Sequence, residues 1–168
     1  QRLVALKGRE PEKPISVLIG DIEMLTTLVT HIPPVATVLI ERFWPGPLTL
    51  ALPARADVSP VLKGGSGTIG VRLSSHPTAT ALVQALGRPL TAPSANPAGA
   101  TPPCRLDEAQ AYFGPTVDAY LDGGTLPGEP ASTVVMVCDP PPDTSGERVK
   151  ILRAGAITPH AMHACITE

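Results

Sequence analysis

The chain has 168 residues, of which 43% are hydrophobic and 17% charged, and this balance is typical of a globular domain rather than a disordered segment. Its formal net charge of −2 argues against a module that holds RNA by bulk electrostatics, because such modules are strongly basic. No apolar run approaches the roughly 20 residues needed to cross a bilayer, and no signal peptide is visible.

Apolar runs separated by Pro and Gly divide the chain into short elements. In the first half of the chain we expect a strand at 15–19, helices at 22–29 (with Asp21 as N-cap) and 34–43, a strand at 48–52, a Gly-rich loop at 63–67 and a strand at 68–73. A helix at 79–86 closed by Gly87, an extended segment at 89–92 and a helix at 107–113 with Gly114 as C-cap should follow. The last part should form strands at 117–121, 133–137 and 149–152, with a Pro-rich surface loop at 139–147, and a helix at 157–164. Strands and helices alternate irregularly, without a tandem repeat. The sequence therefore predicts one α/β (α+β) domain over residues 1–168, built on a mixed sheet.

Several common catalytic signatures are absent from the sequence. There is no P-loop, no GxGxxG and no GxSxG nucleophile elbow. His160, His163 and Cys165 lie close together near the end of the chain, but three loose ligands without a fourth partner are usually incidental, so we predict no metal site there. The odd cysteine count favours a reducing, cytoplasmic setting over a disulfide framework.

Two cations near the start of the chain could neutralise a polyphosphate. Lys7 and Arg9 flank Gly8, and Arg offers a donor fork where Lys offers a point charge. The same residues also fit a solvated basic turn beside Glu10 and Glu12. The pair alone does not decide between these interpretations.

Further along the chain, polar residues stand at the ends of predicted strands. Arg72 closes an apolar strand, where its charge needs a ligand carboxylate or an internal acid. The segment 92–96 places hydroxyl and amide groups in a rigid loop, which could hold a ligand or bond to itself. Ser132 precedes one strand and Arg153 ends another. Each signal is weak by itself.

Taken in order, these segments resemble the YrdC/YciO family over nearly the whole chain. The motifs that carry the resemblance are Lys7-Gly8-Arg9, Phe43-Trp44-Pro45-Gly46-Pro47-Leu48-Thr49, Val71-Arg72 with His76-Pro77, Ala92-Pro93-Ser94-Ala95-Asn96, Ser132-Thr133-Val134-Val135 and Ile151-Leu152-Arg153-Ala154-Gly155. The resemblance implies a twisted mixed sheet with flanking helices and a concave, basic ligand cavity.

The resemblance also implies an ATP-dependent nucleotidyltransferase. Such an enzyme makes L-threonylcarbamoyladenylate from L-threonine, bicarbonate and ATP with Mg²⁺, and releases pyrophosphate. A downstream transferase uses its product to modify tRNA. Through this pathway, the resemblance also suggests that the domain contacts tRNA or double-stranded RNA. This chemistry needs cations and positioning rather than a nucleophilic side chain, and we therefore assign no catalytic nucleophile or base.

The family's site residues are carried over position by position. On the ATP side they are Lys7, Arg9, Asn96, Cys104 and Arg153, and on the threonine side they are Thr68, Arg72, Ser94 and Ser132. The family usually has a hydroxyl residue where Cys104 stands, and a thiol is a poorer donor. The family's opening Thr-x-Thr-x-Tyr-Gly-Leu strand–helix segment is expected before Gln1 and is absent from these residues.

Two other functions stay open at this point. A non-catalytic YrdC-like module that binds RNA or nucleotide is favoured by the missing opening segment and disfavoured by the near-neutral charge. A YrdC-like domain of a carbamoyltransferase would use carbamoyl phosphate, but nothing of the other domains of such proteins is present.

Overall fold

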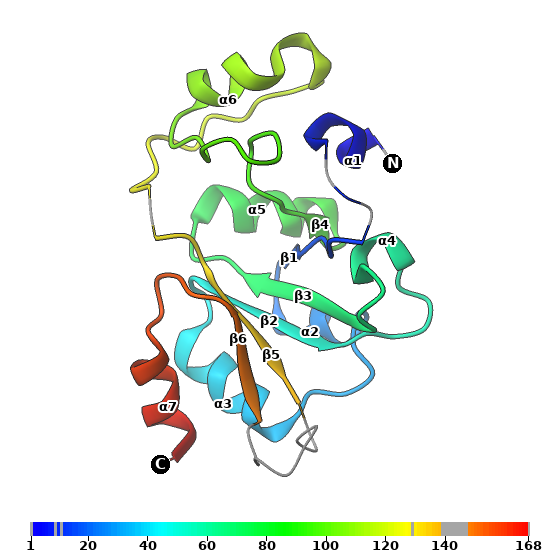
Figure 1. Ribbon diagram of the computed structural model, residues 1–168, viewed down its shortest axis with the longest axis vertical. Helices are drawn as coiled ribbons and strands as arrows, with labels where there is room; N and C mark the ends of the chain where they lie inside the picture. The colour runs from blue at the N-terminus through cyan, green and yellow to red at the C-terminus, as the bar shows by residue number, and fades with distance from the viewer. Residues whose placement is uncertain (1, 9, 11, 129, 139–147, 168) are drawn as a thin grey trace.

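A six-stranded mixed sheet organises the chain, in the strand order β4-β1-β3-β2-β5-β6 (Figure 1). The computed structural model describes residues 2–8, 10, 12–128, 130–138 and 148–167. Neighbouring strands run parallel in the pairs β1–β3 and β2–β5 and antiparallel in the other three. The strands are β1 (Val17–Ile19), β2 (Leu48–Pro53), β3 (Thr68–Leu73), β4 (Leu90–Thr91), β5 (Thr133–Val137) and β6 (Val149–Arg153). The prediction of a mixed sheet is confirmed.

Helices flank the sheet, with α2, α3 and α7 on one side and α1, α5 and α6 on the other (Figure 1). Their bounds are α1 (Arg2–Lys7), α2 (Ile22–Leu25), α3 (Pro34–Phe43), α4 (Pro60–Lys63), α5 (Pro77–Leu86), α6 (Leu106–Phe113) and α7 (Pro159–Thr167), and a short 3₁₀ turn covers Gly114–Thr116. The bounds predicted for α3, β3 and β5 are confirmed. Helices α1 and α4 were not anticipated, because each has too few residues to show a helical period.

The core lies between the sheet and the helices α2, α3 and α7. Strand β3 shows why: Ile69, Val71 and Leu73 are buried and point into this core, whereas Thr68, Gly70 and Arg72 alternate with them. Because side chains alternate between the faces of a strand, these last three residues share the opposite face. One face of β3 therefore serves the core, and the opposite side of the sheet, named the polar face here after Thr68 and Arg72, carries the other residues.

The helix predicted over 22–29 begins as expected and stops early. The Asp21 carboxylate accepts the backbone N–H of Met24 at 2.7 Å, which confirms the predicted N-cap. The helix ends at Leu25, and the hydroxyls of Thr26 and Thr27 then donate to backbone carbonyls three residues earlier. These local bonds compete with continued helix, and the chain turns toward the sheet.

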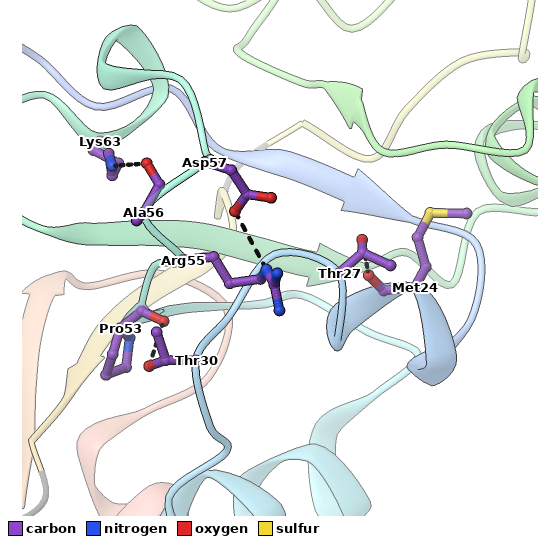
Figure 2. Close-up of polar contacts among 8 residues, drawn as sticks. All are labelled: Met24, Thr27, Thr30, Pro53, Arg55, Ala56, Asp57 and Lys63. Carbon is purple, nitrogen blue, oxygen red and sulfur yellow. Dashed lines mark hydrogen bonds and ion pairs between the residues drawn. The ribbon is translucent and has the colours of Figure 1, made fainter.

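The segment after α2 is joined to the turn after β2 (Figure 2). Thr30 donates its backbone N–H to the Pro53 carbonyl at 3.0 Å, and Arg55 and Asp57 form an exposed ion pair at 3.3 Å. The Lys63 ammonium at the end of α4 reaches the Ala56 carbonyl. These contacts fasten the far end of the sheet and lie away from the polar groups near Arg72.

The strand predicted over 117–121 is wrong. That segment follows the 3₁₀ turn as irregular chain, and Leu121 is 62% exposed. The segment contains the β-formers Val117 and Tyr120, yet it pairs with neither edge strand of the sheet, β4 or β6. Short runs with β propensity become strands only where a partner strand is available. The last helix begins two residues later than predicted, at Pro159, and the predicted loop at 139–147 lies outside the described residues.

Candidate functional site

Arg72 lies on the polar face of the sheet, half-buried near the end of β3. Its Nε donates to the Gly46 carbonyl at 2.8 Å, which fixes the base of the guanidinium. Burial lowers the pKa of Arg72 below its ordinary value, and the positive charge of Arg153 lowers it further. Within the described part of the chain, no carboxylate forms an ion pair with Arg72. Two cations close together without an acid form a site that favours an anion.

Arg153 approaches Arg72 from the end of β6 and is held on Ser132. Its Nε and Nη2 donate to the Ser132 carbonyl at 3.1 and 2.8 Å, and Nη2 also donates to the Ser132 hydroxyl at 2.9 Å. The register pairs Arg153 with Val134, two residues after Ser132, so both residues lie at the same end of the β5–β6 ladder. The structure thus brings together three predicted residues, Arg72, Ser132 and Arg153.

Two further residues of this face were not predicted from the sequence. Thr49 on β2 is buried, and its hydroxyl lies 3.1 Å from the Ser132 hydroxyl. Ser16 precedes β1, and its hydroxyl occupies the space that a Cβ on Gly70 would enter, at 2.6 Å. A glycine within a strand often marks a place where another group packs closely, so Gly70 was the one sequence signal for a neighbour at this position. The neighbour itself could not be read from the sequence, because residues 16 and 70 meet only through the parallel pairing of β1 and β3.

Thr68 lies on the same face of β3 as Arg72, but the structure does not bring the two together. Four residues of strand separate them, which is about 13 Å at about 3.3 Å per residue. The Thr68 hydroxyl instead meets the Ser66 hydroxyl at 2.9 Å. An amino acid that contacted both Thr68 and Arg72 would have to extend over that distance.

A second polar cluster forms where α1 meets the loop 93–97. The Lys7 ammonium is buried and donates to the backbone carbonyls of Ser94 and Asn96. The Ala98 N–H returns a bond to the Lys7 carbonyl at 2.8 Å. Lys7 therefore attaches α1 to the loop, a role that the interpretation as a solvated basic turn does not include.

A cavity of about 220 Å³ opens beside this cluster. Its lining is mostly polar and comes from two stretches of chain, 7–13 and 94–99. The lining residues are Lys7, Gly8, Glu10, Lys13, Ser94, Asn96, Pro97, Ala98 and Gly99. Asn96 is buried, and its Nδ2 donates to the carbonyls of Pro97 and Ala100 at 3.0 and 2.6 Å. Its Oδ1 is buried and has no hydrogen-bond partner in the described part of the chain. A buried oxygen beside a polar cavity is suited to accept a bond from a ligand or water.

The two clusters are linked through the backbone. The N–H of Ala92 donates to the Ser16 carbonyl at 2.9 Å, so the loop that carries Ser94 and Asn96 leaves the sheet beside Gly70. Ser94 is exposed, whereas Asn96 is buried. The loop 93–97 therefore runs from the polar face of the sheet to the cavity at Lys7.

The remaining predicted residues lie elsewhere or outside the described part. Cys104 precedes α6, where its N–H donates to the Glu108 carboxylate at 2.7 Å and its sulfur lies 3.4 Å from where a Cβ on Gly128 would stand. Arg9 lies outside the described ranges.

His160 and His163 line an apolar groove between β6 and α7. Across the described ranges, no three His, Cys, Asp or Glu side chains are grouped to hold a metal ion. A search of the same residues finds no helix long and apolar enough to cross a membrane.

Comparison with known proteins gives consistent matches. A family model named Sua5/YciO/YrdC and described as telomere recombination matches residues 1–155. The chain is 37% identical to the threonylcarbamoyl-AMP synthase of Pyrococcus abyssi over 84% of this chain and 42% of that protein, and 35% identical to that of Bacillus subtilis over 99% and 46%. The crystal structure of P. abyssi Sua5 complexed with L-threonine superposes with a TM-score of 0.89 at 33% identity, covering 98% of this chain and 46% of that one. The chain thus spans about half the length of these relatives.

Proposed function

The chain belongs to the Sua5/YciO/YrdC family, and from that premise we propose that it forms L-threonylcarbamoyladenylate from L-threonine, bicarbonate and ATP and releases pyrophosphate. We assign this nucleotidyltransferase reaction to residues 1–168 as one YrdC-like domain. The observation that carries the proposal is the half-buried guanidinium of Arg72, which lies beside Arg153 and has no carboxylate in the described residues. An amino-acid carboxylate supplies the charge that this position lacks.

On the threonine side, Arg72 provides the anchor. Its Nε is occupied by the Gly46 carbonyl, which leaves the two terminal nitrogens to donate to the two carboxylate oxygens. The Ser132 hydroxyl donates to the same substrate. With the carboxylate fixed, the threonine amine attacks bicarbonate carbon, a C–N bond forms and water leaves, which gives the carbamate. Ser94 at the start of the loop is the remaining proposed threonine contact, and Thr68 keeps that assignment only for a ligand that extends along β3.

On the ATP side, the cavity at Lys7 receives the phosphates. A carbamate oxygen attacks the α-phosphorus, the bond from that phosphorus to the bridging oxygen breaks, and pyrophosphate departs. Positive charge from Lys7, Arg9 and Arg153 stabilises the growing negative charge, while the Asn96 amide orients the nucleotide. Cys104 is proposed as a further ATP contact, with its thiol as the donor.

Mg²⁺ in this reaction arrives with the nucleotide. The donor set of the cavity contains one carboxylate, Glu10, and it is paired with Lys13 at 3.2 Å. A protein-held Mg²⁺ usually takes one or two carboxylates besides the phosphates. Because the Glu10 carboxylate is already bound by an ammonium, the described lining leaves no carboxylate for such a site. We therefore route no step through a protein-bound metal and treat Mg²⁺ as part of the Mg–ATP substrate.

The product is a mixed anhydride, and we propose that a downstream transferase consumes it in the modification of tRNA. A direct contact with tRNA or double-stranded RNA would require a local basic surface, since the net charge is −2. The three cysteines are free thiols. Free thiols support the cytoplasmic setting that we propose for this reaction.

The test is pyrophosphate release measured with all three substrates and with each one omitted in turn. We expect release that requires threonine, bicarbonate and ATP together, and that Arg72→Ala abolishes. Arg42→Ala, an exposed arginine on α3, is the matched control and should release pyrophosphate at the parent rate. Nucleotide binding without release would favour the non-catalytic module, and release of phosphate from carbamoyl phosphate would favour the carbamoyltransferase domain.

A further inference from the structure

Thr49 is a buried polar residue on the face that carries Arg72. It is 3% exposed and stands between Leu48 and Leu50 on β2. The β2–β3 register pairs Leu50 with Val71, and one step along the antiparallel ladder places Thr49 opposite Arg72 on the same face. A buried hydroxyl is costly without a hydrogen bond, and Thr49 bonds to the Ser132 hydroxyl at 3.1 Å.

The Ser132 hydroxyl therefore has two protein neighbours. Arg153 donates to it at 2.9 Å, and Thr49 lies on its other side at 3.1 Å. A hydroxyl oxygen accepts two bonds and donates one. When Arg153 and Thr49 both donate to this oxygen, the Ser132 proton is left for a third direction, which is set by the positions of the two donors.

We propose that Thr49 is a positioning residue of the threonine side, whose hydroxyl holds the Ser132 hydroxyl in one orientation so that Ser132 donates to the substrate bound by Arg72. This inference rests on the proposed function for its substrate. Thr49 itself touches neither substrate and acts through Ser132. The competing explanation is that Thr49 and Ser132 form a buried pair that contributes only to stability.

Three variants separate the two explanations. Thr49→Val keeps the shape of the side chain and removes the hydroxyl, whereas Thr49→Ser keeps the hydroxyl. Thr133→Val is the matched control, because Thr133 is equally buried but its hydroxyl bonds to the backbone of Ile157, at 2.8 and 2.9 Å, on the core face of the same sheet. Thr133→Val should lower the melting temperature through its lost bonds and leave substrate use unchanged.

The expected result is a split between the two substrates. Thr49→Val should raise the KM for threonine about tenfold, the effect of losing one well-placed hydrogen bond. The KM for ATP should change less than about twofold, because Arg153 keeps both bonds to the Ser132 carbonyl. Thr49→Ser should restore the threonine KM. An unchanged threonine KM in Thr49→Val, or an equal rise for both substrates that Thr133→Val reproduces, would overturn the inference.

Crystal structures of the parent chain and the three variants provide a readout that does not depend on activity. Ser132 should occupy one rotamer in the parent chain, in Thr49→Ser and in Thr133→Val, and more than one in Thr49→Val. If the parent chain releases no pyrophosphate, the proposed function fails, and the rotamer of Ser132 still decides the positioning role. A single, unchanged Ser132 rotamer in Thr49→Val refutes it.

Discussion

Replacement of Arg72 by lysine tests the proposed anchor for the threonine carboxylate. The guanidinium uses its Nε on the Gly46 carbonyl at 2.8 Å, which leaves two terminal nitrogens to bind two carboxylate oxygens. Lysine keeps the charge but has a single donor atom, so it loses one of the two parallel bonds. A charge-assisted bond contributes about 1.5–3 kcal/mol, which corresponds to a loss of roughly 10- to 150-fold in threonine affinity.

The assay is initial-rate kinetics with threonine varied at saturating ATP, followed by ATP varied at saturating threonine. We expect Arg72→Lys to raise the threonine KM within that range and to leave the ATP KM nearly unchanged. Thermal melts accompany the kinetics, since an arginine that served only the fold would cost stability without selecting a substrate. Arg42→Lys on the exposed side of α3 is the matched control. Wild-type threonine dependence in Arg72→Lys would refute the carboxylate assignment.

Three further predictions follow from the other contacts. Lys7→Met leaves the carbonyls of Ser94 and Asn96 without their buried donor. The free energy of unfolding measured in urea should therefore fall by about 3 kcal/mol, and calorimetry should show weaker ATP binding. An unchanged free energy of unfolding would mean that these bonds do not hold the loop. Cys104→Ser should leave ATP affinity equal or better, because a hydroxyl is the stronger donor, and a clear loss by calorimetry would exclude this position from the ATP site. Arg2 donates to Asp118 and lowers its pKa, so the contact should be intact above the usual carboxyl pKa of about 4 and be lost as the pH falls through the lowered value. The hydrogen-exchange protection factors of α1, which are corrected for the intrinsic effect of pH on exchange, should therefore fall in acid, and Asp118→Asn should remove that pH dependence.

The sequence was informative wherever one local pattern controlled the structure. The strand predicted over 68–73 has the same bounds in the structure, with Arg72 near its end. Asp21 capped its helix, and Gly87 ended another with a left-handed conformation at φ 66°. These features depend on residues within one or two turns of each other, so a short segment contains the information.

Elements that depend on a partner were predicted less well. The segment 117–121 contains good β-formers, yet it is not a strand, because it pairs with neither edge strand, β4 or β6. Helix α2 stopped at Leu25 because the following threonines bond to the backbone and Val29 pairs with Ala54 across the chain. Pairing with a distant segment, as between Val29 and Ala54, depends on residues that local propensity does not include.

The candidate site divides in the same way. Sequence motifs alone selected Lys7, Arg72, Ser132 and Arg153, and they indicated the family that the comparisons then established. Only the tertiary structure decided that Thr49 lies against Ser132 and that Lys7 bonds to the carbonyls of the 93–97 loop. Residue types that bear charge are visible in a sequence. Their partners depend on the tertiary fold, which brings Thr49 to Ser132, 83 positions away, and Lys7 to Asn96, 89 positions away.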